Sequence, residues 1–174
     1  MGGRMYTASF PPSAETAGIE CFEILLNSTQ LVIVHSIHIG QTSDAGDAEA
    51  GMLRAVIRRG VGNTSGGTGT AVVPRPHDVV QGTFGGTCEG ANNSLAIPGG
   101  GSIVILDDEA FNIQAGWYHT PTPEERFIFN PSEAILISCV DGTEDFADAT
   151  PTTFVSANTY SIVARVTFEV FGTL

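Results

Sequence analysis

Few residues in this chain could carry acid–base or metal chemistry, and their spacing does not predict an active site. There are four histidines. His35 and His38 lie three apart on one predicted strand, so we expect them to point to opposite faces, where they cannot share a metal ion. His77 precedes Asp78, but no Gly-x-Ser-x-Gly nucleophile motif accompanies the pair. We therefore interpret this stretch as a loop held by its two neighbouring prolines.

Acidic residues gather in three short clusters that could supply oxygen ligands to a cation. None has the ligand spacing of a calcium loop such as the EF-hand, so solvated acidic loops are our interpretation and a weak loop calcium is the alternative. Paired carboxylates for glycoside hydrolysis stay open, although Trp117 is the only tryptophan where a sugar cleft usually has several aromatic platforms. We predict no catalytic residue, no metal and no cofactor. The clusters are Asp44/Asp47/Glu49, Asp107/Asp108/Glu109 and Asp141/Glu144/Asp145/Asp148.

The charged residues exclude several functional classes. All seven basic residues are arginines, and without lysine there is no Walker A loop, no Schiff-base lysine and no Ser–Lys dyad. The formal net charge is −12, whereas nucleic-acid binding requires a basic face. The only local group of basic residues in the sequence is Arg54, Arg58 and Arg59. We therefore expect neither nucleic acid nor an anionic membrane as a partner.

The composition is that of a folded chain with an unusually uncharged surface. Apolar residues make up 42% of the sequence and charged residues 15%, below the ~25% of an average globular protein. Cys21, Cys88 and Cys139 are too few and too scattered for a disulfide framework or a zinc site, and the first and last of them read as small core residues. Residues 1–7 contain no apolar signal-peptide core, and no apolar run approaches a membrane span. We expect synthesis in a cytoplasm.

Strand patterns dominate the sequence. Between Tyr160 and Val170, apolar residues alternate with mostly polar ones, which is the period of a half-buried strand. Seven other segments are rich in β-branched and aromatic residues. They are Met5–Phe10, Glu20–Leu26, Leu31–Ile39, Met52–Arg59, Ser102–Leu106, Arg126–Phe129 and Ala134–Val140.

Turn-forming residues separate these segments and predict one all-β domain over residues 1–174. Pro11-Pro12 is expected to end the first strand. Asp44–Leu53 is expected to be a loop with at most one helical turn. Gly60–Gly69 and Gly82–Gly101 predict a long irregular section, and loops of that length are usually functional or ordered by a partner. The predicted architecture is an antiparallel β-sandwich of jelly-roll type, with about eight strands and long Gly/Pro-rich loops.

Residues 109–126 form the most distinctive segment of the chain. It contains Trp117, Tyr118, Pro121 and Pro123. Aromatic residues are frequent interface hot spots, and proline lowers the ordering cost of a docking loop, so we predict that these four residues lie at a contact surface. The alternative, in which Trp117 closes one end of the core and the prolines shape a corner, is equally compatible with the sequence.

Three stretches resemble a group of small virion proteins of tailed phages and prophages. These are 35–49, 84–87 and the segment 109–126, and the closing stretch 166–172 is similar to the C-terminal strand of that group. The resemblance covers most of the chain and carries no catalytic signature. It implies a structural role in a virus particle.

These considerations together predict a non-enzymatic minor capsid or decoration (cement) protein on the capsid exterior. Its expected partners are the major capsid protein or other virion proteins, bridged through the Gly/Pro-rich loops, and copies of itself, most simply as a trimer. The alternative is a carbohydrate- or receptor-binding β-sandwich of a spike, fibre or tail. An exposed Trp117 would favour that alternative, and a buried one would count against it.

Overall fold

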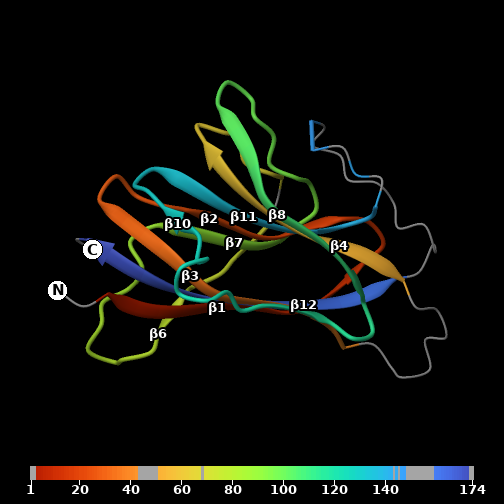
Figure 1. Ribbon diagram of the computed structural model, residues 1–174, viewed down its shortest axis with the longest axis horizontal. Coiled ribbons are helices and arrows are strands. Elements are labelled where there is room, and N and C mark those ends of the chain that lie inside the picture. Colours follow the sequence, from red (N-terminus) through yellow and green to blue (C-terminus); the bar gives the residue numbers. More distant parts are fainter. Residues whose placement is uncertain are drawn as a thin grey trace.

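The computed structural model describes residues 3–42, 51–67, 69–142, 144, 146–147 and 159–172. These residues form strands and no helix, and the strands lie in two layers (Figure 1). The strand bounds are β1 Arg4–Glu15, β2 Ile19–Leu25, β3 Gln30–Gln41, β4 Met52–Val61, β5 Thr70–Ala71, β6 Arg75–Pro76, β7 Thr87–Asn92, β8 Ser102–Asn112, β9 Trp117–His119, β10 Ile128–Phe129, β11 Glu133–Val140 and β12 Tyr160–Gly172.

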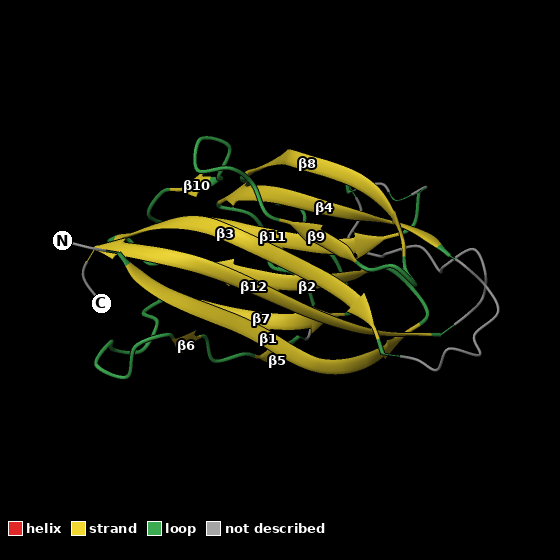
Figure 2. Cartoon of the chain, turned by 60° about the horizontal axis from the view of Figure 1, so that its bottom comes forward, coloured by secondary structure: helices red, strands yellow, loops and turns green. Residues whose placement is uncertain are grey.

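The two layers are antiparallel sheets packed as a sandwich. The first sheet has the order β10-β3-β12-β1-β6, with β9 also paired to β3, and the second has the order β5-β7-β2-β11-β4-β8. Figure 2 shows the first sheet in front, with β12 between β1 and β3. Eight described strands have six residues or more, and the other four have only two or three. The predicted all-β sandwich is therefore confirmed, with four short strands at the sheet margins.

The long strands form where side chains alternate between the core and the surface. In β12, every second residue from Tyr160 to Val170 is at most 3% exposed, and the residues between them are half-buried or exposed. The predicted half-buried strand is thus confirmed. Because β12 is central, it pairs with both β1 and β3 over most of its length.

Two predicted strand ends were wrong, for different reasons. The first strand continues through Pro11-Pro12 to Glu15, with an irregular register between Phe10 and Ser13 that accommodates the prolines. Strand β8 continues beyond Leu106 to Asn112, because its acidic residues remain paired to β4. Of the predicted loop Asp44–Leu53, residues 44–50 lie outside the described residues, while Met52 and Leu53 begin β4.

The long connection from β4 to β8 covers the outer face of the second sheet. It contains the short strands β5 and β6 as well as β7, where the sequence predicted an irregular stretch. Leu95 packs against Val56 and Val140, and Ala96 packs against Ala134 and Leu136. As a result, β11 is buried on both of its faces.

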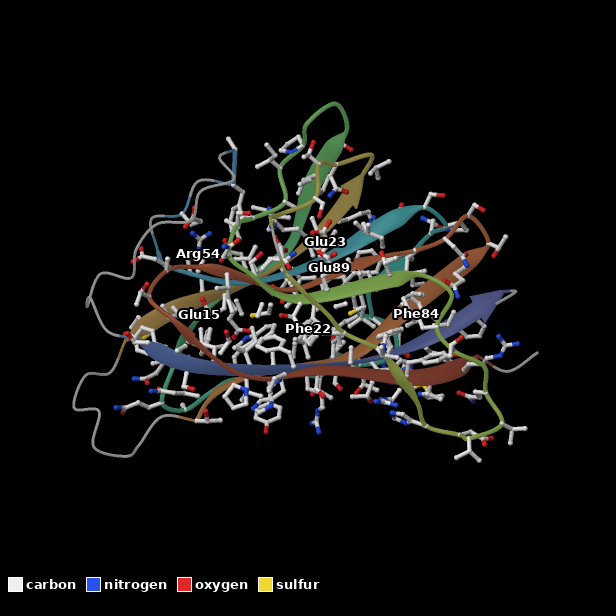
Figure 3. The ribbon with its side chains drawn as sticks, turned by 180° about the vertical axis from the view of Figure 1, so that it is seen from behind. Glu15, Phe22, Glu23, Arg54, Phe84 and Glu89 are labelled. Carbon is white, nitrogen blue, oxygen red and sulfur yellow. The ribbon has the colours of Figure 1, made fainter. Side chains whose placement is uncertain are left out.

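Apolar and aromatic side chains fill the space between the sheets. Tyr6 stacks on Phe168 with ring centroids 5.9 Å apart, and the Phe84 ring meets Phe168 edge-on at 5.4 Å. Cys21 and Cys139 are fully buried among these residues, as predicted for small core side chains. Figure 3 shows Phe22 and Phe84 between the layers, with Glu23 on the opposite side of the same sheet from Phe22.

Candidate functional site

Strand β9 and the loop that follows it carry the four residues predicted to make contacts. Trp117 lies in the core, 4% exposed, and its Nε1 donates a hydrogen bond to Glu109 Oε2 over 2.8 Å. Its ring packs against Phe111, with centroids 6.5 Å apart. This is the position described by the alternative in which Trp117 closes one end of the core.

Tyr118 faces the opposite way, as successive residues of a strand must. It is 64% exposed, and its ring stacks on His38 with centroids 4.1 Å apart. Tyr118 and Pro121 line a shallow groove of about 430 Å³, together with residues of β8 and of the loop after β9. Pro123 lies exposed in the next turn and does not line the groove. The fold thus brings Tyr118 and Pro121 together and leaves the other two residues apart from them.

His119 forms the inner wall of this groove. Its ring lies between Trp117 at 5.7 Å and Phe127 at 5.4 Å, and its Nδ1 is 3.3 Å from Asp107 Oδ2. Within the described part of the chain, its Nε2 has no hydrogen-bond partner. An Asp–His pair supports nucleophilic catalysis when a hydroxyl or thiol hydrogen-bonds the second ring nitrogen. The described residues place no such group there.

The acidic cluster Asp107, Asp108 and Glu109 lies on strand β8 rather than in a loop, so its interpretation as a solvated loop was wrong. Each carboxylate has a different partner. Asp107 contacts His119, Glu109 accepts from Trp117, and Asp108 accepts from Arg54 Nε over 2.9 Å and also from its Nη2. The strand alternation sends Asp108 to the opposite face from its neighbours. Searched over the described residues alone, the chain holds no group of three or more His, Cys, Asp or Glu placed for a metal ion.

The other predicted acidic clusters are described only in part. Asp44, Asp47 and Glu49 lie outside the described residues, and so do Asp145 and Asp148. Asp141 and Glu144 are buried.

The prediction that His35 and His38 point to opposite faces was wrong. The pairing of β3 with β12 skips His35, since Val34 faces Phe168 and Ser36 faces Thr167. This bulge adds one residue and shifts the alternation, so both histidines lie away from the core. His35 Nε2 is 3.0 Å from Glu169 Oε2, whereas His38 stacks on Tyr118. Partial burial, together with Arg165, lowers the pKa of His38.

His77 and Asp78 also have separate partners. His77 Nε2 lies 2.7 Å from Thr7 Oγ1, while Asp78 Oδ1 accepts a hydrogen bond from the backbone N–H of Val80 over 3.0 Å. These contacts hold the loop that follows β6, which agrees with the structural interpretation of this stretch.

Sequence reasoning missed a buried polar network between the second sheet and the β4–β8 connection. Arg58 and Glu20 are both fully buried, with Arg58 Nη2 2.5 Å from Glu20 Oε2. The second terminal nitrogen of the guanidinium, Nη1, donates to the carbonyl of Ala96 over 3.0 Å, and Ser138 Oγ donates to Glu20 Oε1 over 3.2 Å. The Arg58 guanidinium also lies 4.4 Å from the centroid of the Phe146 ring. The available sequence signal was an arginine directly after the apolar run 55–57.

A second buried carboxylate, Glu23, fastens the same connection. Its Oε2 accepts hydrogen bonds from Ser65 Oγ over 2.8 Å, Gly66 N–H over 3.1 Å and Asn92 Nδ2 over 3.3 Å. Burial raises the pKa of Glu23, and it also raises the pKa of Glu20, where Arg58 opposes the effect. Because each of these carboxylates accepts hydrogen bonds from a backbone N–H of the connection and from neighbouring side chains, we assign them to the structure of the connection.

Comparisons with known proteins identify no relative: no protein-family model, no curated protein and no solved structure matches the chain. No helix in the described ranges is long and apolar enough to cross a membrane.

Proposed function

We propose that this chain is a non-enzymatic structural protein of a virus particle, a minor capsid or decoration protein that bridges neighbouring subunits of the shell. In this proposal the partner is the major capsid protein or another virion protein, and the chain lies on the exterior of the capsid. Each bridging contact would stabilise the assembled shell over free subunits by mass action.

The observation that carries the proposal is the order in which the long strands pair. When β5, β6 and β7 are set aside as an insertion, the first strand pairs with the last (β1 with β12) and the second with the next to last (β2 with β11). Strand β3 then pairs with β9 and β10, and β4 pairs with β8. This nested pairing supports a jelly roll, an architecture used by viral capsid domains and also by lectins and cupins. Fold alone does not fix function, so the surface must supply the rest.

Exposed apolar residues favour a role in protein contact. Strand β8 is the terminal strand of its sheet in the described part of the chain, and Val104 and Ile105 are 54% and 48% exposed on it. The tip of the loop after β6 exposes Val79 and Val80 almost completely. Apolar surface of this kind marks interaction sites on soluble proteins.

The alternative, a carbohydrate- or receptor-binding module, has weaker support. Trp117 is buried and is therefore not available as a platform for a sugar ring. That alternative would now depend on Tyr118, which is exposed beside Asp107 and Glu125 in the shallow groove.

Reconstitution tests the proposed function. The purified protein is added to viral shells that lack it, and bound protein is counted while the heat resistance of the shells is measured. Saturable binding at a fixed number of copies per shell, with more resistant shells, is the expected result. Absence of binding, combined with specific retention on a glycan array, would refute the decoration role and favour the alternative.

A further inference from the structure

The loop after β6 has a tip that is apolar, exposed and flanked by hydrogen bonds. Val79 is 99% exposed and Val80 is 87% exposed. In Figure 1 this loop projects from the body directly after β6. Burial of an exposed valine side chain against a partner is favourable, so two adjacent valines presented in this way offer apolar area for a contact.

Hydrogen bonds on both sides fix the shape of the tip. Asp78 Oδ1 accepts from Val80 N–H over 3.0 Å, and the Asp78 carbonyl accepts from Gln81 N–H, also over 3.0 Å. Tyr6 Oη donates to the carbonyl of Gly82 over 2.8 Å. A tip that is already ordered costs less conformational entropy when it binds.

A half-open pocket of about 400 Å³ lies at the same margin of the sandwich. Its apolar lining comes from β1 and from the segment after β5, through Phe10, Pro11, Val72 and Val73. The rest of the lining is largely polar and comes from Thr7, Ser9, Thr70 and the exposed Arg75. The valines of the same chain do not fill this pocket, because they are almost fully exposed. For scale, a cavity of roughly 150 Å³ holds benzene, which has the same number of carbon atoms as two valine side chains.

We propose that the tip formed by Asp78, Val79 and Val80 inserts into this pocket on a second copy of the chain. The two surfaces are complementary: the valines meet the apolar lining, and Asp78 of one copy approaches Arg75 of the next. Tip and pocket lie close together along the chain, so a two-fold axis near this margin would make the contact twice. Without such an axis, the contact joins neighbours around a ring.

Local charge favours a second copy as the occupant. The exposed Arg75 gives the pocket a positive charge that matches the exposed Asp78 of the tip, and this match must act against the repulsion between two chains of net charge −12. The inference deepens the proposed function and rests on it for its biological role, since a decoration protein that self-associates could bridge several subunits at once. The contact itself can be measured on the protein alone.

Sedimentation and light scattering across a wide concentration range test the contact. We expect the unaltered chain to self-associate and the double variant Val79→Asp/Val80→Asp to dissociate roughly 100-fold more readily, since the variant loses the burial of two valine side chains and places two carboxylates in the pocket. The matched control is Val104→Asp, which places the same charge on an exposed valine of β8. We expect that variant to associate like the unaltered chain. Circular dichroism checks that all variants fold.

A double-mutant cycle tests the predicted ion pair. Arg75→Gln and Asp78→Asn should each weaken association, and the double variant should lose little more than either single one. The asparagine keeps the oxygen that caps Val80, so the tip retains its shape. Salt screens both this ion pair and the repulsion between the two acidic chains, so the advantage of the unaltered chain over the double variant should shrink as the salt concentration rises.

Three results would overturn the inference: a monomer at every concentration, an oligomer that persists in Val79→Asp/Val80→Asp, or an oligomer lost only in Val104→Asp. Shell binding is measured separately. If the oligomer is lost in Val79→Asp/Val80→Asp and the unaltered chain does not bind viral shells, this inference stands and the proposed function is refuted. If the chain binds viral shells and stays monomeric at every concentration, the proposed function stands and this inference is refuted.

Discussion

The buried pair of Arg58 and Glu20 allows the sharpest test of what holds this fold together. In Arg58→Met the guanidinium is lost, and the Glu20 carboxylate stays fully buried with only Ser138 and the Ala96 N–H as donors. Breaking a buried ion pair from one side destabilises a protein by about 3–5 kcal/mol. That is a large part of the ~5–15 kcal/mol by which most domains are stable.

Urea unfolding followed by fluorescence measures the loss. We expect the midpoint of Arg58→Met to fall by roughly 2 M, given slopes of ~1–3 kcal/mol/M. The matched control is Arg54→Met, the same substitution on the same strand. Arg54 pairs with Asp108 at a partly exposed position, where an ion pair contributes at most about 1 kcal/mol.

The loss should also depend on pH. Burial raises the pKa of Glu20, and Arg58 opposes this effect, so removal of Arg58 raises the pKa further. A carboxyl whose folded pKa lies above its unfolded value holds an extra proton in the folded state, and its unfavourable effect grows as pH rises through that window. The difference in free energy of unfolding between Arg58→Met and the unaltered chain should therefore become smaller as the pH is lowered from neutral. A deficit no larger than that of Arg54→Met, or one independent of pH, would refute this account of the network.

Three further predictions concern other parts of the molecule. Trp117→Phe should lower the free energy of unfolding by about 1–3 kcal/mol, because Glu109 loses its donor and the core loses volume. Tyr118→Ala should lower the free energy of unfolding by less than about 1 kcal/mol, because Tyr118 is exposed. If chemical unfolding shows equal losses for Trp117→Phe and Tyr118→Ala, the buried position of Trp117 and the exposed position of Tyr118 are contradicted. Burial raises the pKa of Glu23, so stability should fall as pH rises through the window above its unfolded pKa. Glu23→Gln should flatten that part of the stability–pH curve, and an unchanged curve would exclude this carboxyl as the source. Burial raises the pKa of Cys88 to about 12, so the folded chain should react with a thiol reagent only as fast as it unfolds. Rapid labelling of Cys88 at mildly alkaline pH would contradict its burial.

Local patterns predicted the strands but not how far each one continues. The alternation from Tyr160 to Val170 identified β12 because one face of it meets the core and the other meets water. The extension of β8 to Asn112 could not be predicted in this way, since its acidic residues stay in the strand only through their pairing with β4. The bulge at His35 likewise exists only in the register between β3 and β12.

The candidate contact surfaces, too, were only partly predictable from the sequence. The sequence pointed to residues 109–126 as a distinctive segment, and Tyr118 and Pro121 of this segment do line a groove. It could not decide that Trp117 faces inward, because the direction depends on the placement of β9 and the preceding strand β8, which carries Glu109, in different sheets. No sequence pattern singled out the tip at Val79 and Val80, since its exposure depends on tertiary contacts such as the hydrogen bond from Tyr6 to Gly82.

By itself, the sequence determined an all-β chain without lysine, strongly acidic, with a two-sheet core and long connections rich in glycine and proline. These properties follow from composition and from the short periods that strands impose, both of which are local. Only the tertiary structure decided the pairing order of the strands, the burial of Glu20 and Arg58, and the exposure of Val79 and Val80. The physical reason is that burial is set by segments far apart along the chain, and local alternation carries no information about which segment will cover a given face.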